Sequence, residues 1–558
     1  MRKLFRYICA CCAILSTSSC DDFLDIVPMN DVVLENYWTE KADVQSVLNS
    51  CYASMQQEDF LSRAFVWSEW RSDNIVSGTR SNYELAEIQK ENLLPTNSFC
   101  KWAAFYRTIN RCNTVCHYAP EVNSIDPNYT ETEMKANVAE ATALRSLCYF
   151  YLIRTFRDVP FTREPSIDDT QNYYLPAMPF EEVLDNIIAD LEAVKDNAVK
   201  RYYTDESPIA YYNSSKITRY AIYAMLADMY LWKGNYEKCI EHCNVVLDFK
   251  KAQYEEALDR EGNITNIQLF NDYPLILEKP TGTVRAGNTY NEIFGEGNSF
   301  ESIFELRFEN NQTENAFIKN YYGTDDNRTG YAGAPSFLYK EVAVNNNTVF
   351  KSTDCRAYEH IQSMNANYVI TKYVWNSLSF KTTNPETDLN LIASRRDPCY
   401  ANWIFYRMTD VMLMKAEAEI EIGTEEMIKD AFDIISAVYN RANNIVVASS
   451  NNALKFSDYG TSKQAMQELV ILERQRELLF EGKRWYDLVR LARRDGNTRR
   501  LVDLAIQKQK NNLNGIKIRL ANPDIIYFPY AKDELKVNPN LKQNEAYNTG
   551  IDSEIDKN

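Results

Sequence analysis

The chain has 558 residues, a formal net charge of −17 at pH 7 and an aromatic share of 13% that includes 37 Tyr. Because an ordinary domain has about 100–200 residues, this length predicts either several domains or one large helical superstructure. Since negative charge repels phosphate backbones, the sequence argues against a nucleic-acid partner and favours neutral ligands over polyanionic ones.

The N-terminal segment predicts export. Basic residues within the first six positions precede an apolar stretch, and small residues lead up to Cys20. This order is typical of a signal peptide, which we place at residues 1–19 and which is too short to span a membrane. We expect the sulfur of Cys20 to carry a lipid and residues 20–38 to form a tether. Plain secretion with cleavage elsewhere is the alternative, because Thr17 stands where such signals usually have Leu.

Helical periodicity dominates the rest of the chain. It predicts long amphipathic helices over residues 40–57, 101–118, 133–157, 214–248, 408–442 and 463–494. Within the fourth segment, the small residues Ala224 and Ala227 let two helices approach closely, and a turn at residues 234–236 leads into a second helix. This pattern resembles a tetratricopeptide unit of about 34 residues. The sequence therefore predicts an all-α-dominated fold with a tetratricopeptide-like helical-repeat scaffold.

Residues 255–405 have a different character. They contain asparagine clusters, few helical periods and short strand-like pieces such as residues 302–308. Long loops held by a stable scaffold usually carry function, so we expect part of the ligand site here. We predict a single domain, 39–558, that combines a helical scaffold, a loop-rich lobe with minor short β strands, and a C-terminal tail. The scaffold covers 39–250 and 406–500, the lobe about 255–405, and the tail 501–558.

Four stretches in chain order resemble the SusD/RagB family of nutrient-uptake lipoproteins. They are Asp22-Phe23-Leu24-Asp25-Ile26-Val27-Pro28, residues 406–418, the charged stretch Glu473–Arg490, and residues 527–544, which include Tyr527-Phe528-Pro529-Tyr530. Two departures are Gln475, where the family often has a basic residue, and Tyr527-Phe528-Pro529, where Pro-Ile-Pro-like residues are usual.

The resemblance implies a carbohydrate-binding protein of a polysaccharide-utilisation system. Such a protein is anchored by its lipid to the outer membrane, faces the cell exterior and sits as a lid over a SusC-like TonB-dependent transporter. It captures an oligosaccharide for import, uses no cofactor and is not an enzyme. The alternatives are a peptide-binding member of the same family, a surface glycosidase, and an assembly scaffold that binds no soluble ligand.

The sequence offers little for catalysis or metal binding. The alternating charges of residues 473–490 are expected to lock this helix to its neighbours, so we assign no catalytic residue there. Cys239, His242 and Cys243 share a helical face, and Cys112, Cys116 and His117 nearly do, but they could bind zinc only if the two faces met. We expect these thiols to fill core positions and predict no metal site.

Aromatic residues carry the functional signal. Sugar rings stack their C–H faces on Trp and Tyr, while their hydroxyls bond to Asn, Asp and Arg. Two segments combine these residue types, although most aromatic residues of a helical protein belong to its core. The predicted ligand-binding residues are Trp67, Trp70, Arg71, Asp73, Asn74, Tyr83 and Trp102 in the first segment, and Tyr273, Tyr290, Tyr321, Tyr322 and Tyr331 in the second.

Overall fold

The computed structural model describes residues 37–167, 173–202, 213–262, 264–278, 287–323, 329–339, 349–351, 353–364, 367–382, 389–396, 398–443, 453–509 and 511–548. The predicted signal peptide, Cys20 and the stretch 22–28 lie outside these residues.

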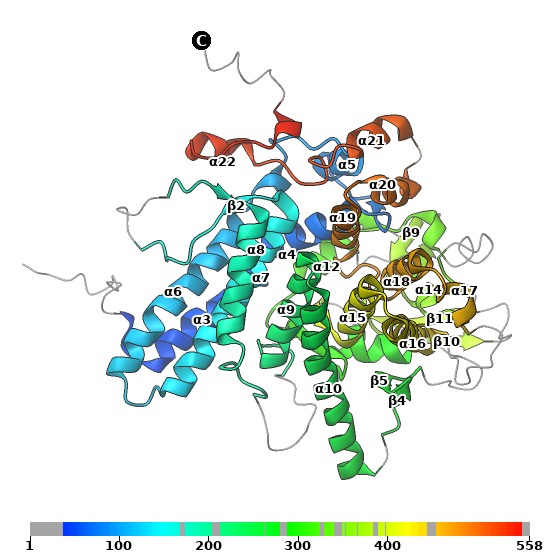
Figure 1. The fold of residues 1–558 in the computed structure, drawn as a ribbon, viewed down its shortest axis with the longest axis horizontal. Coiled ribbons are helices and arrows are strands. Elements are labelled where there is room, and N and C mark those ends of the chain that lie inside the picture. The colour runs from blue at the N-terminus through cyan, green and yellow to red at the C-terminus, as the bar shows by residue number, and fades with distance from the viewer. Residues whose placement is uncertain are drawn as a thin grey trace, which may run out of the picture.

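Nine helices form a continuous row in which each packs against the next (Figure 1). In order they are α3 (Lys41–Met55), α6 (Ala103–Ile125), α7 (Glu131–Phe156), α8 (Phe180–Val194), α9 (Arg219–Lys233), α10 (Tyr236–Glu261), α15 (Met408–Ile422), α16 (Glu425–Ala442) and α18 (Lys463–Glu477). The row confirms the predicted helical-repeat scaffold. It also joins chain segments before and after the irregular region, because α10 packs directly on α15.

The turn between α9 and α10 shows why the repeat forms. Gly234 ends α9 in the left-handed conformation, with φ +75°, and the side chain of Asn235 accepts a hydrogen bond from the Lys238 N–H at the start of α10. A glycine adopts this conformation at little cost, and an Asn side chain satisfies a helix N–H that would otherwise lack a partner. The predicted turn at 234–236 is confirmed.

Two predicted helices are each divided in the structure. Residues 408–442 form α15 and α16, because Gly423 has φ +80° and Thr424 caps the next helix. Residues 463–494 form α18 and α19 (Arg484–Asp495), and the break between them places Phe480 at φ +64° and Gly482 at φ +69°. The expectation of one uninterrupted helix in each segment was wrong.

Shorter helices complete the scaffold. α5, α19, α20, α21 and α22 lie together at the top of Figure 1. Their bounds, with those of the other short helices, are α4 (Glu58–Phe65), the π-helix η2 (Val66–Trp70), α5 (Tyr83–Gln89), η3 (Ser98–Cys100), α11 (Asn288–Tyr290), η4 (Asn291–Glu296), α12 (Ala316–Tyr321), η5 (Ser336–Leu338), α14 (Arg356–Glu359), α17 (Phe456–Tyr459), α20 (Arg499–Ala505), η6 (Ile506–Lys508), α21 (Leu513–Leu520), α22 (Lys532–Val537) and η7 (Glu545–Tyr547).

The strands are short and pair in antiparallel twos; within the described residues no sheet has a third strand. The pairs are β1 (Val76–Ser77) with β7 (Ala332–Gly333), β2 (Val159–Pro160) with β3 (Ala177–Met178), β4 (Ile267–Phe270) with β5 (Tyr273–Ile276), β6 (Ser302–Leu306) with β12 (Trp403–Arg407), β8 (Ile361–Met364) with β9 (Asn367–Ile370), and β10 (Trp375–Thr382) with β11 (Leu389–Arg395). The β6–β12 pair, with Leu306 opposite Trp403, closes the irregular region onto the scaffold, because α15 begins where β12 ends.

One hydrophobic core runs through the molecule. The nine cysteines from Cys51 to Cys399 are all free thiols, and all except the half-buried Cys116 are buried, which confirms their expected role as core side chains. Among the residues that the structure covers, no helix is long and apolar enough to cross a membrane.

Candidate functional site

The two tryptophans predicted to bind ligand lie inside the core. Trp67 and Trp70 belong to η2 and both are fully buried. The indole N–H of Trp67 donates to the carbonyl of Phe99 at 2.7 Å, and that of Trp70 donates to the carbonyl of Leu85 at 2.9 Å. A buried ring with a satisfied N–H offers no face to a sugar, so their placement argues against ligand contact.

The neighbouring Arg71 is equally buried. Its guanidinium group donates to the Glu91 carboxylate at 2.8 Å and to the carbonyl oxygens of Ile525 and Ile526. It also lies 4.4 Å from the centre of the Trp485 ring, a distance at which a cation interacts favourably with an aromatic face. Arg71 therefore holds the C-terminal part of the chain against η2 rather than reaching solvent.

Asp73 and Asn74 bind the charged stretch 473–490. The guanidinium group of Arg484 donates to both carboxylate oxygens of Asp73, at 2.8 and 2.9 Å. The amide of Gln475 donates to Asp73 at 3.0 Å and to the Asn74 side chain at 2.9 Å. Because these polar groups are buried and already partnered, they act as internal anchors, and the ligand role expected for them is not supported.

Glu69 completes this anchor. It accepts hydrogen bonds from the backbone N–H groups of Lys483 and Arg484, at 2.9 and 3.0 Å, which lie at the start of α19. Burial raises the pKa of Glu69 to about 7, although the hydrogen bonds from Asn74 and from these N–H groups oppose the rise. The helix N-terminus favours the negative form of such a carboxylate.

Three of the aromatic residues predicted in the irregular region, Tyr290, Tyr321 and Tyr322, are also internal, as is Trp102 of the first segment. Tyr321 lies edge-on to Trp70, with ring centres 6.2 Å apart, and the hydroxyl of Tyr322 donates to the Phe480 carbonyl at 2.5 Å. Tyr290 donates to the Thr371 carbonyl at 2.7 Å, and Trp102 packs on Tyr530 with ring centres 5.2 Å apart. The fold thus brings the two predicted segments together, but within the core.

Three predicted residues keep access to solvent. Tyr83 opens α5 and its side chain is 73% exposed, whereas Tyr331 and Tyr273 are half-buried. Tyr331 lies in the loop that leads into β7 and packs edge-on to Tyr321 at 5.1 Å. Tyr273 belongs to the distant β5 and contacts Lys415 of α15.

The β1–β7 ribbon fixes the loop that leads to Tyr83. The Gly78 N–H donates to the Tyr331 carbonyl at 2.6 Å, and the Thr79 N–H donates to the Thr329 hydroxyl at 2.5 Å. A Cβ at Gly78 would lie 2.3 Å from the Gly330 carbonyl oxygen, so only glycine allows the two backbones to approach this closely. The ribbon joins the segment before α5 to the segment that carries Tyr331.

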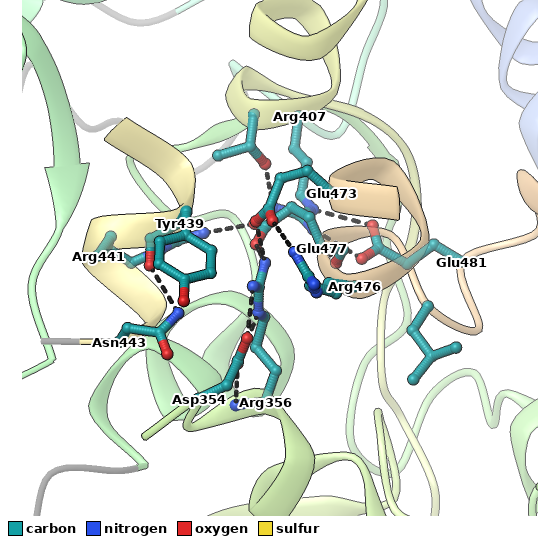
Figure 2. Close-up of polar contacts among 12 residues, drawn as sticks. Asp354, Arg356, Arg407, Tyr439, Arg441, Asn443, Glu473, Arg476, Glu477 and Glu481 are labelled. Atoms are coloured by element: carbon teal, nitrogen blue, oxygen red, sulfur yellow. Dashed lines mark hydrogen bonds and ion pairs between the residues drawn. The ribbon is translucent and has the colours of Figure 1, made fainter. Parts of the chain in front are cut away.

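A buried charge cluster holds α18 and the segment after it (Figure 2). Glu477 lies among Arg356, Arg407 and Arg441: Arg356 donates to it at 2.8 Å, Arg407 at 2.6 Å, and Arg441 also pairs with it. Burial alone would raise the pKa of Glu477, but the three guanidinium groups hold it well below its usual range. The ionised form of Glu477 is therefore the stable one.

The cluster is balanced in charge. It links five cations, Arg356, Lys372, Arg407, Arg441 and Arg476, with five anions, Glu301, Asp354, Glu473, Glu477 and Glu481. Buried charges persist only when they are paired in this way. The prediction that the charges of residues 473–490 lock their helix to its neighbours is confirmed.

The thiol and imidazole groups considered for zinc are used elsewhere. The ring nitrogens of His242 lie 2.9 Å from the Lys238 carbonyl oxygen and 3.0 Å from the Glu192 carboxylate. Within the described part of the chain, no three His, Cys, Asp or Glu side chains form a group that could hold a metal ion.

Sequence reasoning missed a surface cleft over α9 and α10. Its volume is about 760 Å³, and it is lined by Lys200, Arg201, Tyr220, Val245, Asp248, Phe249 and Ala252. Tyr220 and Phe249 occupy helical positions that resemble ordinary packing positions, so nothing in the periodicity marks them as surface residues. The sequence signal available was the adjacent Lys200 and Arg201, which follow α8.

Comparisons with known proteins agree with this architecture. The SusD family model matches residues 381–547, and a model described as "Starch-binding associating with outer membrane" matches residues 22–231. SusD-like protein P38 of Formosa agariphila is 24% identical over 552 residues, which cover 95% of this chain and 96% of the relative.

Solved structures give the same result. A SusD superfamily protein from Bacteroides thetaiotaomicron VPI-5482 has a TM-score of 0.65 at 19% identity, and the match covers 91% of this chain and 99% of that one. A protein named "Laminarin binding SusD-like protein" has a TM-score of 0.60 at 19% identity, with coverage of 91% and 99%.

The helical row, the irregular region and these matches define a helical-repeat protein of the SusD-like class. The chain is similar to the SusD/RagB family along most of its length, because the two family models match residues 22–231 and 381–547.

Proposed function

We propose that this protein is a glycan-binding subunit at the outer membrane, which captures an oligosaccharide and delivers it to a SusC-like TonB-dependent transporter. Two findings support the proposal: one matching family model is described as starch-binding and outer-membrane-associated, and one structural neighbour is named for laminarin binding. In this proposal the protein is anchored by a lipid on Cys20, faces the cell exterior, and does no chemistry on its ligand.

The observation that carries the proposal is the exposed ring of Tyr83. A tyrosine ring that is 73% exposed at the start of a rigid helix presents a flat apolar face to solvent. Arg80 and Asn82, both exposed, stand on the same loop and supply the polar groups that sugar hydroxyls require. Because the β1–β7 ribbon holds this loop, little conformational entropy opposes binding.

We place the ligand over Tyr83 and the segment of Tyr331. These are the predicted ligand residues that combine solvent access with a position at the β1–β7 ribbon. Tyr273 belongs to a separate surface beside α15 and is not part of this site. The site is open, so it would bind an internal stretch of a polysaccharide as readily as a chain end.

The test is a calorimetric titration of the purified protein with laminarihexaose, maltohexaose and xylohexaose, with a reducing-sugar assay on the same mixtures. We expect binding of at least one neutral hexasaccharide and no new reducing ends. Replacing Tyr83→Ala removes one stacking ring, which is worth about 0.5–1.5 kcal/mol, so we expect affinity to fall by about twofold to tenfold.

Tyr173→Ala is the matched control, because Tyr173 is also a solvent-exposed tyrosine, at 49%, but lies on another part of the chain. An equal loss of affinity in both variants, or no binding of any hexasaccharide, would reject the proposed site. Release of reducing ends would reject a pure binding function.

A further inference from the structure

The cleft over α9 and α10 is built around a stacked pair of aromatic rings. Tyr220 of α9 and Phe249 of α10 lie parallel, with ring centres 3.5 Å apart and an angle of 10° between the planes. Both side chains are half-buried and both line the cleft. At about 760 Å³ the cleft falls within the range of about 300–1,000 Å³ that small-molecule sites usually have.

A smaller pocket opens from the same rings. It shares Lys200, Tyr220 and Phe249 with the cleft, and most of its other lining residues carry hydroxyl or amide groups, although the surface that faces the pocket is mainly apolar. These residues come from the segment before α9, from α10, from the turn before β6 and from the start of β6: Asn213, Ser214, Thr218, Lys250, Gln253, Asn298, Ser299, Phe300, Ser302 and Ile303. Its volume is about 40 Å³, and a single water molecule needs about 10–15 Å³, so the pocket has room for a group of a few atoms.

Lysine side chains line both spaces without carboxylate partners. Lys200 is exposed at the mouth, and it forms no ion pair with any residue of the described ranges. Lys250 is 6% exposed and donates to the backbone carbonyls of Phe300 and Ser302, at 2.6 and 2.8 Å. No carboxylate in the described part of the chain lies within ion-pairing distance of Lys250. Burial lowers the pKa of Lys250 to about 7, although the charges of Glu301 and Glu305 oppose that shift.

Arg201, which also lines the cleft, is held in place by its contacts. Arg201 pairs with Glu256 at 3.0 Å, and its guanidinium carbon lies 5.4 Å from the centre of the Phe249 ring. Among the described residues that line the cleft and the pocket, Asp248 is the one acidic side chain. The lining therefore holds three basic side chains, Lys200, Arg201 and Lys250, and one acidic one, and Glu256 outside the lining offsets Arg201. A buried or partly buried ammonium group gains most from an anion placed beside it.

We propose that this cleft is a second carbohydrate site, specific for an acidic oligosaccharide that carries carboxylate or sulfate groups. A sugar ring lies against Tyr220 and Phe249, and the anionic group lies between Lys200 and the entrance to the smaller pocket. The pocket is large enough for a carboxylate but not for a sugar ring, so the ring stays in the cleft. This inference rests on the proposed function only in taking the ligand to be a sugar, since none of its residues belongs to the Tyr83 site.

The test compares an acid with its neutral counterpart. The full-length protein is titrated with trigalacturonate, trimannuronate and a sulfated galactan oligosaccharide, and with the methyl ester of trigalacturonate, the methyl ester of trimannuronate and the desulfated galactan. We expect at least one acidic ligand to bind ten times more tightly than its neutral counterpart, and to lose affinity as NaCl rises from 50 to 500 mM. Equal binding of acid and counterpart in all three pairs, or no binding of any acid, would overturn the proposal.

Variants locate the site. Lys200→Met should weaken binding of the acid at least threefold and leave the neutral counterpart unchanged, and Tyr220→Ala should weaken both. Lys251→Met is the matched control, because Lys251 is an exposed lysine of α10 that does not line the cleft. An equal effect of Lys200→Met and Lys251→Met would overturn the assignment.

The two proposals fail separately. If neutral hexasaccharides bind and respond to Tyr83→Ala while no acidic ligand binds, the Tyr83 site stands and the cleft proposal falls. If acidic ligands bind and respond to Lys200→Met while no neutral hexasaccharide binds, the cleft proposal stands and the Tyr83 site falls.

Discussion

The buried charge cluster predicts a large stability loss when one charge is removed without a change of shape. Glu477→Gln keeps the size of the side chain but leaves the five cations of the cluster facing four anions. Arg356, Arg407 and Arg441 then share a net positive charge out of contact with water. Removing one partner of a buried ion pair costs about 3–5 kcal/mol, so the free energy of unfolding should fall by that amount at pH 7.

The same loss can be expressed as a melting temperature. At about 2.1 cal/mol/K per residue, unfolding of a 558-residue chain has an entropy of about 1.2 kcal/mol/K, so a loss of 4 kcal/mol lowers Tm by about 3 °C. Urea unfolding followed by tryptophan fluorescence therefore measures the effect better than a thermal scan. Asp433→Asn is the control, because it breaks the surface pair Lys429–Asp433, and we expect at most about 1 kcal/mol from it.

Acid should reduce the difference between the Glu477→Gln variant and the wild type. Because the folded pKa of Glu477 is depressed, its stabilisation is complete above the unfolded value of about 4.3 and is lost as pH falls towards the folded value. The gap in unfolding free energy should therefore be full at pH 7 and narrow below about pH 4. A gap under 1 kcal/mol at pH 7, or one that stays constant on acidification, would refute the view that Glu477 neutralises the three arginines.

Three further predictions test other parts of the structure. Gly482→Ala should lower the unfolding free energy by at least about 1 kcal/mol more than Gly496→Ala does. Both glycines have positive φ, but a Cβ at Gly482 would lie 2.9 Å from the Ser68 hydroxyl, whereas nothing lies within 4 Å of a Cβ at Gly496. Equal losses in urea unfolding would contradict this prediction. Trp67→Ala should lower the unfolding free energy by about 3–5 kcal/mol, because the ring is fully buried. The folded variant should bind oligosaccharide in calorimetry with the wild-type affinity, and a loss of affinity would show that Trp67 contacts the ligand. Between pH 7.5 and 9.5, the unfolding free energy of the wild type should rise by up to about 1.4 kcal/mol per pH unit relative to that of Lys250→Met. The reason is that Lys250 has a pKa of about 7 in the folded protein and about 10.4 in the unfolded chain, so in this range the unfolded chain binds a proton that the folded protein has released. Parallel pH profiles of the two proteins would contradict this prediction.

Local signals in the sequence predicted the helical scaffold, and they also explain why two helix breaks were missed. Gly234 and Asn235 interrupt a strong helical pattern, and the α9–α10 turn follows from them. Gly423 and Thr424 carry the same kind of signal, but apolar periodicity continues on both sides and hid the break between α15 and α16. Phe480 has φ +64°, a conformation that a non-glycine residue adopts only when tertiary contacts impose it. Gly482 is a local break signal of the same kind as Gly423, whereas the conformation of Phe480 was not predictable from local propensity.

The ligand site was harder to predict because one composition serves two purposes. A segment of Trp, Asp, Asn and Arg is equally suited to bind a sugar or to anchor a buried helix. What decides the matter for Asp73 is its contact with Gln475 and Arg484, some 400 positions further along the chain. No pattern within the segment encodes that contact. Tyr83 differs because it stays exposed at the start of α5, directly after the helix cap Asn82.

The net charge of the chain does not by itself predict which ligand a single site selects. A net charge of −17 favours neutral ligands only if the charges act together, yet ions screen exposed charges beyond about 8–10 Å at physiological salt. The ten charges of the buried cluster sum to zero, so the cluster adds no net charge to the chain. Selection at a given site is therefore set by the few charges within one screening length. At the α9–α10 cleft these charges are Lys200, Asp248 and Arg201, and Arg201 is paired with Glu256. Lys200 forms no ion pair with a carboxylate of the described residues, so we expect it to favour an anionic sugar at this site despite the negative net charge of the chain.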